Sequence, residues 1–150
     1  MIDPLRISID VACSAGHAFH IWTDLIDCWW PRDHTATNID GSSIVLEKKV
    51  GGRLFERTPD GAEHVWGTVT SWQPPQRFGY TWHIRRDAAD ATDVDIRFVP
   101  VGDRTRIDIV HTGWERLGAD GPHWRDLNRG GWHGVLPRFV AFAGPETERE

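Results

Sequence analysis

Two side chains that can exchange protons, Tyr80 and His111, fall in segments whose apolar alternation predicts inward-facing strand positions. A histidine titrates near neutral pH, and a phenol both donates and accepts hydrogen bonds. Either side chain could therefore orient a ligand or transfer a proton. The alternative is that both are core residues hydrogen-bonded to their neighbours. Their positions in the sequence leave both interpretations open.

A pair of glutamates flanks the dipeptide Gly51-Gly52. If these glycines form a two-residue hairpin loop, Glu47 lies directly opposite Glu56. Like charges in that arrangement repel, and one carboxyl could keep its proton up to near neutral pH. On an inward face the pair would be an acid/base pair or a site for a basic ligand. On an outward face it would be a solvated surface tempered by neighbouring Lys and Arg side chains.

Other combinations of residues carry weaker chemical signals. His17, His20 and Asp24 have the i, i+3, i+7 spacing of three metal ligands, but this is also the polar face of an amphipathic helix. We predict no metal, and two isolated cysteines, Cys13 and Cys28, predict reduced thiols. The chain has no G-x-S-x-G, P-loop or G-x-G-x-x-G motif. We therefore assign no catalytic residue and predict no cofactor.

Composition limits the class of protein. The 150 residues suit one domain and carry a net charge of −5, with 17 Lys and Arg against 22 Asp and Glu. No basic cluster resembles the surface that nucleic-acid-binding proteins present to phosphates. There is also no basic N-terminal region followed by an apolar stretch, and no apolar run long enough to span a bilayer. We therefore expect a cytoplasmic protein with neither nucleic acid nor a membrane as partner.

The elements that would position these residues begin with strands. Period-two alternation predicts seven strands, mostly antiparallel. They lie near residues 7–11, 43–49, 53–57, 63–72, 77–84, 94–98 and 107–111. Glycine-rich and proline-rich turns separate several of them. In the fourth strand, Val65, Gly67 and Val69 are expected to share one face.

A long helix is predicted over residues 121–143. Pro122 lies near its first turn, and apolar residues recur at spacings of three and four. Pro137 removes a backbone hydrogen bond and is expected to kink this helix. A shorter helical segment is predicted from about Ala15 and should end before Pro31.

Short pieces distributed over almost the whole chain carry a family resemblance: Phe19-x-x-Trp22-Thr-Asp24, Trp29-Trp30-Pro31, Val50-Gly51-Gly52-Arg53-x-Phe55-Glu56, Asp60-Gly61-x-Glu63, Trp66-Gly67-x-Val69, Pro74-Pro75-x-Arg77-Phe78, Tyr80-Thr81-Trp82, Thr105-Arg106-Ile107, His111-x-Gly113-Trp114 and Gly131-Trp132-x-x-Val135-Leu136. In this order and spacing, the chain resembles the SRPBCC (START-like, birch-pollen-allergen-like) superfamily. It is most similar in pattern to bacterial proteins that resemble the C-terminal domain of the activator of the heat-shock-protein-ninety ATPase.

The resemblance implies an α+β helix-grip fold in a single domain over residues 1–150. A curved seven-stranded antiparallel sheet would surround a long C-terminal helix, with two short helices after the first strand and a cavity between sheet and helix. Glu47 and Glu56 are possible polar groups of that cavity. The candidate ligand-binding residues are those expected on the inner faces: Phe78, Tyr80, Trp82, Phe98, His111, Trp132 and Phe139. Alternatively, the rings fill the interior and leave no cavity.

Three tryptophans, Trp29, Trp30 and Trp114, fall next to predicted loops. They could cap the mouth of the cavity or contact a partner protein. The alternative is a satellite cluster beneath the first helices.

Three functions compete. The first is non-catalytic binding of a small hydrophobic molecule in the cavity. The second is a chaperone partnership of the kind the family name describes, although the eukaryotic activators carry an additional N-terminal domain that these 150 residues do not include. The third is a cyclase- or dehydratase-type enzyme using the same cavity, with Tyr80, His111 or the glutamates as proton-transfer groups.

Overall fold

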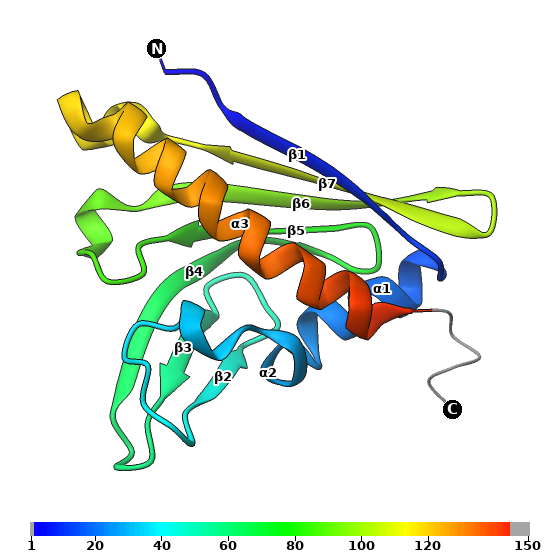
Figure 1. Cartoon of the computed structure of the whole chain (residues 1–150), viewed down its shortest axis with the longest axis horizontal. Helices are drawn as coiled ribbons and strands as arrows, with labels where there is room; N and C mark the ends of the chain where they lie inside the picture. Colours follow the sequence, from blue (N-terminus) through cyan, green and yellow to red (C-terminus); the bar gives the residue numbers. More distant parts are fainter. Residues whose placement is uncertain (1, 145–150) are drawn as a thin grey trace.

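The computed structural model describes residues 2–144, which form one antiparallel sheet and three α-helices (Figure 1). The strand order is β1-β7-β6-β5-β4-β3-β2. This confirms the predicted helix-grip fold. The elements are β1 (Leu5–Val11), α1 (Ala15–Thr23), α2 (Ile26–Trp29), β2 (Ser43–Leu46), β3 (Arg53–Arg57), β4 (Glu63–Gln73), β5 (Arg77–Trp82), β6 (Thr92–Val101), β7 (Arg104–Thr112) and α3 (Gly121–Ala143), with 3-10 turns η1 (Arg32–His34), η2 (Ala88–Asp90) and η3 (Trp114–Asp120).

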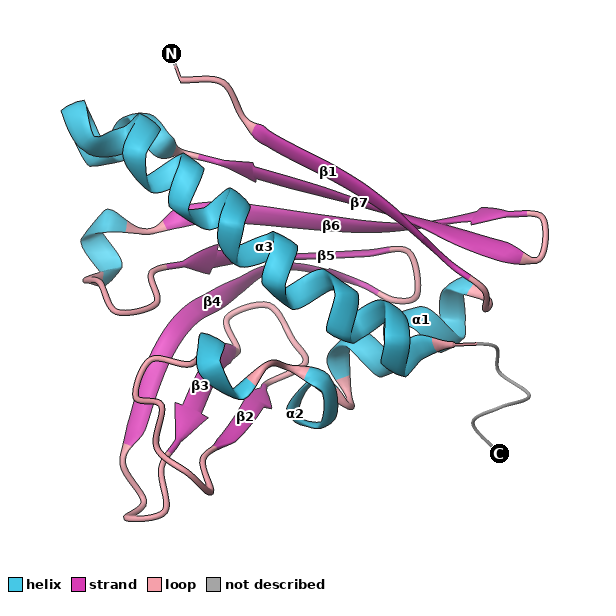
Figure 2. Cartoon of the chain, viewed as in Figure 1, coloured by secondary structure: helices cyan, strands magenta, loops and turns pink. Residues whose placement is uncertain are grey.

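Helix α3 lies across one face of the curved sheet (Figure 2). The two short helices sit near its C-terminal end, and β4 bends away from β5 toward the short strands β2 and β3 (Figure 1). The sheet therefore encloses α3 on one side only. The opposite face of the sheet carries the outward-facing polar residues of the alternating strands.

Local chemistry explains the helix boundaries. Ser14 caps α1, because its side chain accepts a hydrogen bond from the His17 backbone N–H at 3.2 Å. Pro122 stands in the first turn of α3, where a missing N–H has no cost. Helix α3 continues through Pro137 without interruption. Pro137 lies on the exposed face, where water can bond the carbonyl that it leaves free. The kink at Pro137 stays a prediction.

Strand β4 departs from simple alternation. Its register with β3 shifts between Leu54 and Phe55, which pair with Gly67 and Val65 respectively. A second shift separates Val69 from Ser71 in the pairing with β5. The predicted common face of Val65, Gly67 and Val69 is therefore wrong, since Val65 is 38% exposed while Val69 is buried. These bulges bend the strand and increase its twist.

The interior is built from aromatic rings. Phe19 of α1 makes edge contacts with Phe78 of β5 and Phe98 of β6, at ring-centroid distances of 5.7 and 5.1 Å. Trp22 contacts Phe139 of α3 at 4.7 Å. Such pairs add stabilisation beyond that of the area they bury. The aromatic contacts thus join α1, the sheet and α3 in one core.

Among residues 2–144, no helix is both long enough and apolar enough to cross a membrane.

The bulged strand yields a stability prediction. A Cβ atom at Gly67 would lie 1.7 Å from the Thr81 carbonyl oxygen, so Gly67→Ala must push β4 away from β5. We expect unfolding free energy to fall by about 3 kcal/mol, measured by urea denaturation. Gly16→Ala is the control, because nothing lies within 4 Å of the added Cβ in α1. It should stabilise the protein by up to about 1 kcal/mol. Equal stability of both variants would contradict the close strand approach.

Candidate functional site

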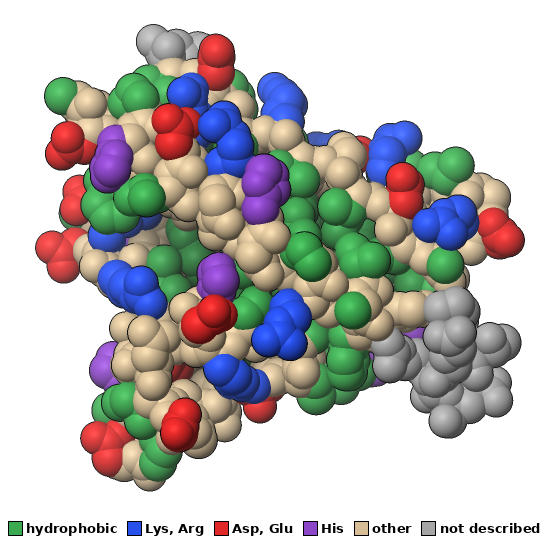
Figure 3. All heavy atoms as spheres, viewed as in Figure 1, with side chains coloured by type: hydrophobic (Ala, Val, Ile, Leu, Met, Phe, Trp, Pro, Cys, Tyr) green, Lys and Arg blue, Asp and Glu red, His purple; other side chains and the backbone are tan. Residues whose placement is uncertain are grey.

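A cavity of about 440 Å³ lies beside α3, between this helix, turn η1 and the end of β5. Figure 3 shows hydrophobic side chains inside a hollow on the face that carries α3. Volumes of this order are typical of small-molecule sites. The lining residues come from three parts of the chain: Trp30, Asp33, His34, Trp82, Ile84, Arg85, Trp124, Leu127, Asn128, Gly131, Trp132 and Val135.

The deeper part of the cavity is apolar. Trp30, Trp82, Trp132 and Val135 line it and are each less than one-tenth exposed. Gly131 leaves room in the wall formed by α3, because nothing lies within 4 Å of the Cβ that another residue would add. The cavity thus offers three indole rings and an unfilled space to an apolar ligand.

The outer part carries polar groups. Asp33 and Arg85 are exposed, and His34 and Asn128 are partly buried. Asn128 is fixed by two hydrogen bonds: its side-chain oxygen accepts from Trp82 Nε1 at 3.2 Å, and its nitrogen donates to the Trp124 carbonyl at 2.9 Å. An apolar interior with a few polar groups at its mouth is typical of ligand sites.

His111 is completely buried behind this cavity. Its Nδ1 accepts a hydrogen bond from Trp132 Nε1 at 3.2 Å, so its Nε2 carries the proton and donates to Thr92 Oγ1 at 2.6 Å. Thr92 in turn donates to the Trp82 carbonyl at 3.3 Å. Burial lowers the pKa of His111 to about 3, and the charge of Arg86 acts in the same direction. Both ring nitrogens are therefore occupied, and the neutral ring positions Trp132.

The predicted ligand-binding residues fall into two groups. Trp82 and Trp132 line the cavity, whereas His111 lies one layer behind it. The other four do not line this cavity; they pack into the core and are at most 2% exposed: Phe78, Tyr80, Phe98 and Phe139. Burial raises the pKa of Tyr80 well above its ordinary range. The rings that were expected to surround a ligand thus mainly fill the interior.

The loop tryptophans also separate. Trp30 lines the cavity, with its Nε1 bonded to the His34 carbonyl at 3.0 Å. Trp29 packs between Trp22 and α3, and Trp114 is buried against the His111 ring.

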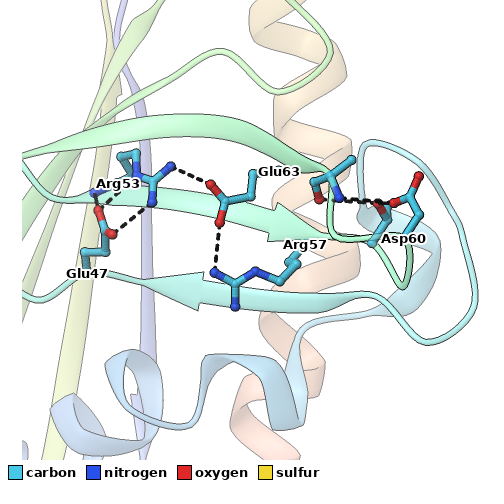
Figure 4. Close-up of polar contacts among 7 residues, drawn as sticks. Glu47, Arg53, Arg57, Asp60 and Glu63 are labelled. Carbon is cyan, nitrogen blue, oxygen red and sulfur yellow. Dashed lines mark hydrogen bonds and ion pairs between the residues drawn. The ribbon is translucent and has the colours of Figure 1, made fainter.

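The expected opposition of Glu47 and Glu56 is wrong. Gly51-Gly52 is not a two-residue hairpin loop; it pairs with Val69 of β4, so that β2 and β3 align with Glu56 opposite Ile44. Glu47 instead contacts Arg53, with side-chain bonds of 3.1 and 3.0 Å (Figure 4). These bonds and the Arg53 charge lower the pKa of Glu47 to about 2. Glu47 is therefore an ionised member of a surface ion-pair network.

Glu56 has a different environment, since it is completely buried. Its carboxylate accepts a hydrogen bond from the Ala36 backbone N–H at 2.8 Å and another from the Thr37 hydroxyl. The segment that it holds directly follows η1. Glu56 therefore fixes the loop directly after η1, the turn that forms one wall of the cavity, and Glu56 does not line the cavity itself.

Metal ions and charged ligands have weaker support as occupants of other regions. Among the described residues, no group of three or more His, Cys, Asp or Glu side chains could hold a metal ion. The outer face of the sheet has a hollow of about 950 Å³, but its charged groups pair with one another, as Arg77 and Arg97 do with Asp95 at 2.6 and 3.0 Å. The cavity beside α3 is therefore the stronger candidate.

Four polar residues of the cavity mouth had no place in the sequence predictions: Asp33, His34, Arg85 and Asn128. Asp33, His34 and Arg85 lie outside the strands and α-helices, where no periodicity predicts which way a side chain points. The sequence pattern that could have indicated this site is the adjacent pair Asp33-His34, shortly after Trp-Trp-Pro.

The comparison with protein families matches residues 12–144 to the model described as activator of Hsp90 ATPase homolog 1-like protein. The chain belongs to this family. The predicted membership of the SRPBCC superfamily is thereby confirmed. No curated protein matches the sequence significantly.

Solved structures of similar fold include members with described activities. One is an anthrahydroquino-γ-pyrone synthase, Txn09, with 31% identity and a TM-score of 0.63, covering 93% of this chain and 96% of that one. A second is the self-sacrificing resistance protein CalC from Micromonospora echinospora, with 26% identity, a TM-score of 0.71 and 93% coverage of both chains. A Mesorhizobium loti protein with 15% identity and a TM-score of 0.69, covering 93% of this chain and 95% of that one, shares the fold.

The buried histidine predicts an acid-dependent loss of stability. The unfolded chain protonates it near its ordinary pKa of 6.5, whereas the folded protein resists protonation down to about pH 3. Its effect on unfolding free energy is therefore absent above pH 6.5, and stability falls as the pH drops through this window, by up to about 1.4 kcal/mol per pH unit. Urea titrations at pH 7 and pH 5 should show the loss in the wild type and a smaller one in His111→Gln. Parallel pH dependences would contradict this account.

The two glutamates yield a matched pair of variants. Glu56→Ala leaves the Ala36 N–H without its buried acceptor and should lower unfolding free energy by about 1–3 kcal/mol. Glu47→Ala removes a solvent-screened ion pair and should change stability little. Thermal unfolding of both variants measures the difference. Equal melting temperatures would show that Glu56 does not anchor the loop.

Proposed function

We propose that the protein binds a small, flat, hydrophobic molecule in the cavity between α3, η1 and the end of β5. The observation that carries this proposal is the set of three buried indoles, Trp30, Trp82 and Trp132, around a space of about 440 Å³. Indole faces stack on flat aromatic ligands and need few polar contacts. The proposal requires neither a metal nor a cofactor.

The hydrogen bonds around the indoles support a preformed site. Trp30 Nε1 bonds the His34 carbonyl, Trp82 Nε1 bonds Asn128, and Trp132 Nε1 bonds His111. Each ring is thereby held before any ligand arrives. A preformed site avoids the entropy that ordering side chains would cost on binding.

The relatives favour the same class of ligand. The 31% identical Txn09 is described as a synthase of an anthrahydroquino-γ-pyrone, whose name denotes a fused aromatic molecule. This favours a second candidate function, in which the cavity holds such a molecule while a reaction occurs.

A chaperone partnership rests on the family description alone. Catalysis through His111 has little support, because both ring nitrogens already have partners.

Two neighbouring glycines of α3 provide the test. Gly131 lines the cavity and Gly130 does not, and a Cβ at either position meets nothing within 4 Å. We expect wild-type protein to bind 2-methoxynaphthalene with a micromolar dissociation constant, about −8 kcal/mol, in a calorimetric titration. Gly131→Leu should abolish this binding by filling the cavity. Gly130→Leu should bind like the wild type.

Either of two results would count against the site. Absence of binding to the wild type would remove the proposed function. Equal binding by the two leucine variants would place the ligand elsewhere.

A further inference from the structure

The mouth of the cavity holds a histidine that apolar binding does not explain. His34 ends turn η1 and lines the cavity with its side chain 30% exposed. Its backbone is held on both sides: its N–H donates to the Pro31 carbonyl at 3.1 Å, and its carbonyl accepts from Trp30 Nε1 at 3.0 Å. The imidazole therefore projects from a fixed backbone next to one of the indoles that line the cavity.

Asp33 selects the form of this ring. His34 Nδ1 lies 2.8 Å from Asp33 Oδ1. Because an ionised carboxylate only accepts hydrogen bonds, Nδ1 carries the proton and Nε2 of the neutral ring has a free lone pair. The bond to His34 lowers the pKa of Asp33, which keeps it ionised. The Asp33 side chain is 84% exposed, so water screens its charge. Its main effect is therefore to orient the His34 ring.

The accepting nitrogen lies close to α3. A Cβ at Gly134 would approach His34 Nε2 to 2.6 Å and Cε1 to 2.8 Å. Glycine at this position therefore lets the imidazole edge rest against the helix, one turn from the space at Gly131. Within residues 2–144, no donor forms a hydrogen bond with His34 Nε2. The ring thus brings an available acceptor to the helix that forms the cavity wall.

Arg85 supplies a positive charge at the same mouth. Its guanidinium donates to the Thr35 carbonyl, which follows His34 in the chain. Among the described residues it forms no ion pair with a carboxylate, so several of its N–H donors stay available. Its backbone has a φ of 60°, a conformation uncommon for a residue with a side chain. An acceptor and a cation therefore flank the opening of an aromatic cavity.

We propose that His34 and Arg85 form a polar subsite for the acidic hydroxyl of a flat aromatic ligand, a phenol or an enol. The hydroxyl donates its hydrogen bond to His34 Nε2, and its oxygen, which becomes more negative, faces the Arg85 guanidinium. Asp33 is a positioning residue that holds the tautomer. This subsite rests on the proposed function, because the ring of the ligand occupies the cavity between the indoles.

Two ligands of the same ring system separate the subsite from the cavity. 2-Naphthol has a hydroxyl that donates, whereas 2-methoxynaphthalene has a methyl ether that only accepts. Calorimetric titration of the full chain should give a dissociation constant about tenfold lower for 2-naphthol, the effect expected of one hydrogen bond. His34→Phe keeps a flat ring but removes the acceptor. It should bind 2-naphthol and 2-methoxynaphthalene with equal affinity, so the tenfold preference is lost.

Variants of Asp33 test the positioning role. Asp33→Asn can still accept from His34 Nδ1 and should keep the preference for 2-naphthol. Asp33→Leu cannot, so the tautomer is no longer fixed and the preference for 2-naphthol over 2-methoxynaphthalene should shrink. A merely structural role for Asp33 would weaken the binding of both ligands equally.

The outcomes distinguish the two proposals. A wild type that binds both ligands equally, or a His34→Phe variant that still prefers 2-naphthol, overturns the hydroxyl subsite and leaves the apolar cavity in place. Failure of the wild type to bind 2-methoxynaphthalene overturns the cavity, and the subsite with it.

Discussion

A closed circuit of hydrogen bonds fixes helix α3 on the sheet. It runs from Trp132 of α3 to His111 of β7, on to Thr92 of β6 and the Trp82 carbonyl of β5. It then returns from the Trp82 indole to Asn128, one turn before Trp132 on α3. A polar chain of this kind is tolerated in a core only when every member has its partner. Because apolar contacts alone tolerate sliding, this circuit determines the register of the helix and hence the positions of both indoles.

The fold could be predicted from the periodic spacing of apolar residues in the sequence. Strands with one buried face alternate, and Gly121–Ala143 was predicted with the bounds that the structure has. Prediction failed where pairing between strands overrides local pattern. The bulges of β4 expose Val65, and the pairing of Gly51 with Val69 makes Arg53 the partner of Glu47. Register depends on contacts between distant segments, which alternation within one strand does not encode.

The site was less predictable than the fold, for two reasons. Alternation identifies inward-facing residues, but not which of them meet a space: Phe78 lies among other rings while Trp82 borders the cavity. The polar mouth comes mostly from loops, where His34 and Arg85 are placed by turns and by hydrogen bonds to neighbouring carbonyls. Such placement depends on tertiary structure. Glu56 also illustrates this, since its buried role is to hold a loop twenty residues earlier in the chain.

The indoles of the core form a continuous series across the molecule. Successive ring centroids from Trp22 to Trp29, Trp30, Trp66 and Trp82 are 5.1, 5.7, 5.4 and 5.8 Å apart. Rings this close exchange excitation energy faster than they emit light, so a photon absorbed at one end of the series samples all of it. Because Trp30 and Trp82 line the cavity, a molecule bound there would change the emission of the whole series.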